Sequence, residues 1–198
     1  GKVSDFFGFQ YMRDIDSGEL GHNTSFVPRI SNNVLYILNK NQKKQLVALA
    51  YEQEKLLEEF ALKRFPLIKA FYRLRENDIP TGSNSLDKEA VKEYCGEMYL
   101  LDGLLSYQRA EVLGRVIRSL DDDQKAALNK LSFNDSQTWP EKPEQIDKAS
   151  MPHDVHVAIT TYASEMFSWY AGSIEADVYF CPERHGTYFG SFYMKDIP

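Results

Sequence analysis

A long apolar repeat between residues 86 and 119 constrains the fold of this chain more than any other feature. Its positions alternate in steps of three and four, with one polar member, and they are Val91, Tyr94, Met98, Leu101, Leu105, Gln108 and Val112. This spacing is typical of a heptad seam and predicts a helix of roughly 50 Å at about 1.5 Å per residue. Such a helix has to lie against another long helix or a partner chain to bury its seam.

Three glycines interrupt this segment, at Gly96, Gly103 and Gly114. Each lowers the stability of a helix by up to about 1 kcal/mol relative to alanine. They either mark close helix contacts or are simply tolerated, and the spacing does not decide between these alternatives.

A second helix is predicted over residues 40–63. Its apolar stripe has helical spacing and consists of Leu46, Leu49, Ala50, Leu56, Leu57 and Phe60. Pro66 lacks an N–H group and should kink or break this helix, with a shorter helix continuing to about Arg75. Residues 77–85, with Pro80 and Gly82, read as a loop. Two long helices joined by a loop predict an antiparallel hairpin.

A short phrase occurs twice, as Leu38-Asn39-Lys40-Asn41-Gln42 and as Leu120-Asp121-Asp122-Asp123-Gln124. Asn39 and Asp121 are residue types that accept hydrogen bonds from the N–H groups of a first helical turn. The repeat therefore indicates two helix starts in a duplicated helical unit. The second start predicts a short helix to about Leu131, with three Asp residues where the helix dipole favours negative charge.

The remaining segments complete an all-α fold. Residues 1–33 are expected to be mostly irregular, and residues 132–151 to form a linker. After Pro152, at a first helical position, a helix to about Glu175 carries an apolar face of Val155, Ile159, Tyr162, Met166 and Trp169. The tail from Asp177 to Pro198 is expected to form either a short β-hairpin or an extended strap.

We therefore predict a long antiparallel helical hairpin with additional helices and an irregular aromatic-rich C-terminal extension. Three parts are expected: an N-terminal arm (1–33), a helical domain (34–135), and a linker, helix and aromatic tail (136–198) packing on that domain. The tail aromatics, which either cover the helices or bind a partner, are Tyr179, Phe180, Tyr188, Phe189, Phe192 and Tyr193.

Composition excludes several classes of function. The formal net charge of −6 argues against a nucleic-acid binder, which needs a basic face, and against a polybasic membrane-surface binder. No run of about 18 apolar residues exists, so we expect no membrane span. Because the chain begins at Gly1 rather than Met, we expect a processed N-terminus. Cys95 and Cys181 either form one disulfide in an oxidising compartment or are two buried thiols.

The two Leu-x-x-x-Gln phrases, each opening a helix, and the long helix between them resemble the LTxxQ motifs of the Spy/CpxP family over about residues 30–135. That resemblance implies a periplasmic or otherwise exported all-α protein that forms antiparallel homodimers. It also implies an ATP-independent chaperone or an envelope-stress or metal-stress sensor. The structural positions closing the hairpin ends would be Leu38, Asn39, Gln42, Leu120, Asp121 and Gln124, none of them catalytic. Asn39 and Asp121 replace the family's Thr.

Histidines give the one candidate metal site. His153 and His156 lie three residues apart at a helix start, a spacing at which two imidazoles can share a transition metal, with His185, Glu183 or Cys181 as a further ligand. The alternative is that these histidines are exposed to solvent and bind no metal. The segment Cys181–His185 lacks the second Cys of a covalent haem site.

No enzyme signature is present. The glutamates of the two long helices, Glu52, Glu54, Glu58, Glu59, Glu93, Glu97 and Glu111, lack the Glu-x-x-His pairs of di-metal bundles and are expected to form a solvated charged face. Neither a Gly-x-Ser-x-Gly nor a Gly-rich phosphate loop occurs. Three functions stay open: an envelope stress protein binding unfolded or partner proteins without ATP, a metal-responsive periplasmic protein, and a structural subunit of an envelope assembly.

Overall fold

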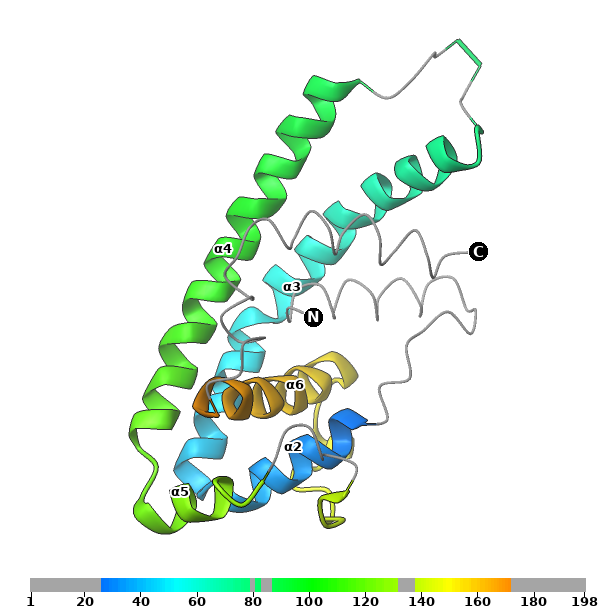
Figure 1. The fold of residues 1–198 in the computed structure, drawn as a ribbon. Coiled ribbons are helices and arrows are strands. Elements are labelled where there is room, and N and C mark those ends of the chain that lie inside the picture. Colours follow the sequence, from blue (N-terminus) through cyan, green and yellow to red (C-terminus); the bar gives the residue numbers. More distant parts are fainter. Residues whose placement is uncertain (1–25, 79–80, 83–86, 132–137, 172–198) are drawn as a thin grey trace. The chain divides into compact units, whose positions relative to one another are not determined.

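The computed structural model describes residues 26–78, 81–82, 87–131 and 138–171, and helices account for its regular structure throughout (Figure 1). They are α2 (Phe26–Ile37), α3 (Lys40–Arg75), α4 (Lys88–Arg118), α5 (Asp122–Leu128), the 3₁₀ helix η2 (Lys148–Ser150) and α6 (His153–Tyr170). The prediction of an all-α fold is confirmed for these residues. The expected N-terminal arm before Phe26 and the aromatic tail lie outside the described residues.

Contacts divide the chain into two compact units, whose boundaries run through α3 and α4. The described residues of the first unit are 55–78, 81–82 and 87–106, and those of the second are 26–54, 107–131 and 138–171. The expected boundary at residue 33 falls within α2, and the one at residue 135 lies outside the described residues, so the division into three parts stays a prediction.

The seam of α4 is confirmed. Met98, Leu105 and Val112 are buried and its remaining members are half-buried. Within the first unit, Tyr94 donates a hydrogen bond to the backbone oxygen of Lys63. Within the second unit, the polar member of the seam is satisfied because Gln53 Nε2 donates to Gln108 Oε1 at 2.8 Å.

The direction of the two long helices follows from two pairs within the second unit. Gln42 Nε2 lies 3.1 Å from the backbone oxygen of Ser119, and Gln53 Nε2 lies 2.8 Å from Gln108 Oε1. A later residue of α3 thus meets an earlier residue of α4, so the two helices are antiparallel in this unit, as predicted.

Pro66 does not end α3, so of the predicted kink or break the break is wrong. The helix runs through this residue to Arg75. A proline inside a helix costs about 3 kcal/mol because one hydrogen bond is lost and the ring crowds the preceding turn. Pro66 lies on the exposed side, whereas Phe60 and Leu67 on either side of it are buried. Packing of these flanking residues holds the helix on both sides of the proline.

Residues 26–33 are helical, which corrects the expected irregular arm through residue 33. Pro28 falls in the first turn of α2, where a backbone N–H has no helical partner to lose. Ile30, Val34 and Leu35 are buried at helical spacing, and α2 packs against α6 and α5 (Figure 1). Burial of these apolar side chains therefore stabilises a helix here, although the segment contains residue types that are common in turns.

The apolar face of α6 is confirmed, with Val155, Ile159, Tyr162 and Met166 all buried. Pro152 is the N-cap residue, one position before the predicted one. The described part of the linker also contributes to the core, because the Trp139 ring packs edge-on against Phe167 with centroids 5.1 Å apart.

None of the described helices is long and apolar enough to cross a membrane, in agreement with the expected lack of a span.

Candidate functional site

The repeated phrase forms two capping boxes of the same geometry. Asn39 Oδ1 accepts hydrogen bonds from the backbone N–H of Gln42 at 3.0 Å, and Asn39 N–H donates to Gln42 Oε1 at 2.8 Å. At the second copy, Gln124 N–H donates to Asp121 Oδ1 at 2.8 Å and Asp121 N–H donates to Gln124 Oε1 at 3.1 Å. Each glutamine therefore caps the helix that it opens.

The two glutamines also bind each other. Gln42 Nε2 donates to Gln124 Oε1 at 3.1 Å, and Gln124 Nε2 donates to Gln42 Oε1 at 2.7 Å. Gln42 Nε2 further contacts the backbone oxygen and Oγ of Ser119, while Gln124 Nε2 donates to the backbone oxygen of Ile37 at 3.0 Å. Both amides are buried. This junction joins the start of α3 to the start of α5 and has no chemistry beyond hydrogen bonding.

Leu38 and Leu120 are both buried beside this junction. The structure thus brings together all six motif residues named from the sequence. The sequence did not predict the hydrogen bonds between the two glutamine amides. The repeat indicates that each copy opens a helix, but not that the two copies are in contact.

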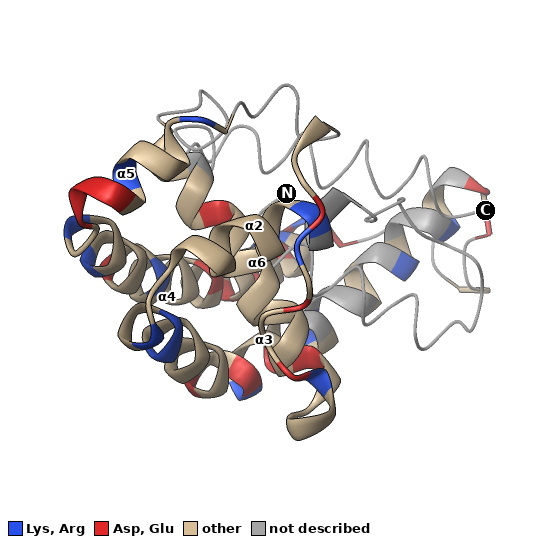
Figure 2. Ribbon diagram, turned by 90° about the horizontal axis from the view of Figure 1, so that it is seen from below, with Lys and Arg blue, Asp and Glu red and all other residues tan. Residues whose placement is uncertain are grey.

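Charge differs sharply between the two helix starts. The first turn of α5 contains Asp122 and Asp123, which complement the positive end of the helix dipole (Figure 2). The first turn of α3 contains no acidic residue and begins with Lys40, followed by Lys43 and Lys44. Positive side chains therefore add to the positive end of α3.

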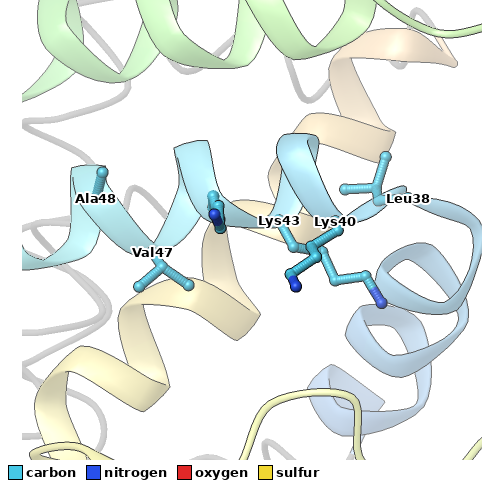
Figure 3. Close-up of a pocket in the computed structure, with 6 residues that line it drawn as sticks. Leu38, Lys40, Lys43, Val47 and Ala48 are labelled. Carbon is cyan, nitrogen blue, oxygen red and sulfur yellow. The ribbon is translucent and has the colours of Figure 1, made fainter.

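A pocket of about 560 Å³ lies beside this lysine cluster. It is lined by Leu38, Lys40, Lys43, Lys44, Val47 and Ala48. Figure 3 shows the side chains of Lys40, Lys43 and Val47 extending toward the same side of α3. Lys43 Nζ contacts a neutral acceptor, Gln145 Oε1, at 3.4 Å.

A buried ion pair that the sequence did not indicate links α4 to α6. Arg109 Nε lies 3.1 Å from Glu165 Oε2, and the two side chains are 1% and 3% exposed. Beside it, Tyr162 donates a hydrogen bond to Gln53 Oε1 at 2.7 Å. Burial, the largest cause, raises the pKa of the Tyr162 hydroxyl above its ordinary value. The one available signal is that Glu165 falls on the apolar side of α6, one turn from Tyr162.

The two candidate metal ligands in the described residues do not form a ligand cluster. His153 is exposed, whereas His156 is half-buried with Nε2 2.7 Å from Glu144 Oε1. Within the described ranges, no group of three His, Cys, Asp or Glu side chains has the arrangement to hold a metal ion. His185, Glu183 and Cys181 lie outside the described residues.

Cys95 is a half-buried thiol on α4, and burial raises its pKa. Cys181 lies outside the described residues, so a disulfide between the two cysteines and a pair of buried thiols both stay open. The glutamates of the two long helices are exposed, apart from the half-buried Glu54, as expected for a solvated charged face.

An apolar stripe lies on the face of α4 opposite its buried seam. It consists of Leu100, Leu104 and Tyr107, spaced four and three residues apart, and is called the α4 stripe below. Leu100 is 78% exposed and Tyr107 is 70% exposed. Gly96 and Gly103 lie beside it, and among the described residues nothing comes within 4 Å of a Cβ built at either glycine. The glycines therefore serve no close helix contact within the described chain.

Comparisons with known proteins give no relative. No protein-family model, curated protein or solved structure matches this chain.

Proposed function

We propose that this chain binds other proteins without ATP, and that the α4 stripe is the surface they bind. The observation that supports this is the exposure of Leu100 and Tyr107 in the middle of a long helix. A single exposed leucine is ordinary, whereas three large apolar residues in line on one helix face are typical of protein-binding surfaces.

The stripe favours weak, reversible binding. Burying a Leu or aromatic side chain fully contributes about 1.5–3 kcal/mol, so these three partly exposed residues contribute about 3–6 kcal/mol before the costs of association. Exposed Glu97 and Glu111 flank the stripe on the same helix. A client would therefore be held by apolar contacts and released without an energy source.

The cellular setting of this proposal rests on the resemblance to the Spy/CpxP family. A periplasmic stress protein needs a surface for unfolded or partner proteins and no catalytic centre. The two capping boxes and the long helix between them are the features that support this assignment.

A client aggregation assay tests the proposal, with the variant Leu100→Glu and the matched control Leu62→Glu on α3. Both replaced leucines are exposed, so both variants should fold. We expect the parent chain and Leu62→Glu to suppress aggregation of a denatured client and Leu100→Glu to lose most of this effect. Equal suppression by both variants, or none by the parent, would reject the α4 stripe as the client surface.

We further propose that the same face forms the homodimer that the resemblance implies. In an antiparallel pair of α4 helices, Leu100 of one copy can lie over Gly103 of the other while Tyr107 lies over Gly96. Both large side chains then meet positions where the described chain leaves open space. In this register Lys92 faces Glu111, so the flanking charges are also complementary.

Native mass as a function of concentration tests the dimer. The variant Gly103→Leu fills the space that Leu100 would occupy, so we expect it to remain monomeric at concentrations where the parent chain is dimeric. A parent chain that is monomeric throughout, or a Gly103→Leu variant that still pairs, would refute this interface. Because clients and the second copy would compete for one face, client binding should strengthen on dilution.

A further inference from the structure

Three lysines at the start of α3 stand where a helix least favours positive charge. The first turn of α3 has no acidic residue, and the start of α5, joined to it through the Gln42–Gln124 pair, has Asp122 and Asp123. The positive potential is therefore balanced at α5 and increased at α3.

Within the described residues, these lysines have no acidic partner. Lys43 Nζ contacts the neutral Gln145 Oε1, and among the described residues no carboxylate forms an ion pair with Lys40, Lys43 or Lys44. Other lysines of the same unit do have such pairs, for example Lys125 with Asp122 and Lys148 with Glu144. In a chain of net charge −6, three ammonium groups without an ion pair among the described residues therefore lie close together on two turns of one helix.

The same lysines line the pocket of about 560 Å³, whose remaining lining is apolar. Leu38 is buried, Val47 is half-buried and Ala48 is exposed. The volume lies within the range of small-molecule sites, about 300–1,000 Å³. Cationic and apolar groups thus line the same pocket.

We propose that this pocket binds an amphiphile with one anionic headgroup on an apolar chain, of the class of a medium-chain fatty acid. The ammonium groups of Lys40, Lys43 and Lys44 neutralise the headgroup, and Leu38, Val47 and Ala48 contact the chain. An inorganic anion would use only the lysines, and a neutral apolar molecule would leave them unpaired. This site lies on α3 and is independent of the α4 stripe.

Calorimetric titration of the full chain tests the proposal, with decanoate, decanol and inorganic phosphate as probes. We expect decanoate to bind at one equivalent and more weakly at high salt, because the lysines are exposed to screening. The triple variant Lys40→Gln, Lys43→Gln and Lys44→Gln should lose about tenfold or more in affinity. The matched triple variant Lys125→Gln, Lys130→Gln and Lys148→Gln should bind as the parent does.

A second variant separates the pocket from its charge. Ala48→Trp keeps the lysines and fills the cavity at an exposed position, so it should fold as the parent does and bind decanoate at least about tenfold more weakly. Thermal melting of each variant without ligand confirms that it is folded.

The remaining outcomes overturn the proposal. Decanol binding as tightly as decanoate would show that the charges are not used, and phosphate binding as tightly would show that the apolar lining is not used. Absence of decanoate binding would reject the ligand class. Binding only to phosphatidylglycerol vesicles would show a membrane-surface contact instead. Leu100→Glu should leave decanoate binding unchanged, so failure here is distinguishable from failure of the protein-binding proposal.

Discussion

Replacing Gln42 by Leu should remove the hydrogen bonds that join the two repeated helix starts. The Gln42 side chain accepts from Asn39 N–H and Gln124 Nε2, and its own Nε2 donates to Gln124 Oε1 and to both the backbone oxygen and Oγ of Ser119. Leu fills a similar volume but has no polar atom. The change therefore tests hydrogen bonding rather than packing.

The expected loss of stability in Gln42→Leu depends on which polar groups still have a hydrogen-bond partner. The Gln124 amide retains Asp121 N–H and the Ile37 oxygen, and the exposed Asn39 N–H can be hydrated. One lost cap contributes about 1 kcal/mol and each buried polar group left without a partner about 1–3 kcal/mol. We expect the free energy of unfolding to fall by about 2–4 kcal/mol.

A Gln42→Glu variant sharpens this test. A carboxylate still accepts from Asn39 N–H, as in an ordinary capping box, but it cannot donate to Gln124 Oε1 or to Ser119. At pH 7 this variant should therefore keep the cap and lose the amide pair, with a free energy of unfolding below that of the parent.

Urea denaturation followed by far-UV circular dichroism measures these changes. Gln45→Leu is the matched control, because Gln45 is half-buried on the same helix and has no hydrogen bond of its side chain in the described structure. It should change the free energy of unfolding by less than about 0.5 kcal/mol. A Gln42→Leu variant as stable as Gln45→Leu would refute the assigned role of the amide pair.

Three further predictions concern buried groups. Glu165→Gln removes the charge facing Arg109 and should lower the free energy of unfolding by about 3–5 kcal/mol, while the double variant Arg109→Met with Glu165→Leu should recover most of this in urea melts. Tyr162→Phe removes a buried donor and should cost about 1–3 kcal/mol in the same assay; in the parent chain, spectroscopic titration should place ionisation of Tyr162 above the ordinary tyrosine range. In a Cys181→Ser chain, alkylation of Cys95 should reach its half-maximal rate at a higher pH than for an exposed cysteine, because burial disfavours the thiolate, and an ordinary midpoint would contradict the burial.

Local patterns predicted most of the helices, because their causes lie within a few residues. The seam of α4 and the cap at Asp121 need only spacing and residue type. α2 was missed because its stability depends on distant packing: Asn33, which reads as a turn residue, donates to the backbone oxygen of Pro140 at 2.8 Å. The expected break at Pro66 was wrong for the same reason.

The candidate sites depended even more on tertiary structure. Arg109 and Glu165 look like ordinary surface charges in the sequence, and only the packing of α6 on α4 brings them together in the core. Likewise, Lys40, Lys43 and Lys44 read as a common charged helix start. Only the structure shows that they line a pocket and have no acidic partner among the described residues.

The glycines beside the α4 stripe allow a last prediction, about helix stability and binding together. Gly96 and Gly103 each cost a helix up to about 1 kcal/mol relative to alanine, and no described atom lies within 4 Å of a Cβ at either position. Gly96→Ala with Gly103→Ala should therefore raise the free energy of unfolding of the monomer by about 1–2 kcal/mol in urea melts. A stabilised monomer that also dimerises more weakly would show that the open positions serve a partner, because a methyl group then occupies space that Leu100 or Tyr107 of the second copy needs. A destabilised monomer would instead mean that these positions are already covered within the chain, and the α4 face would lose its role in both proposals.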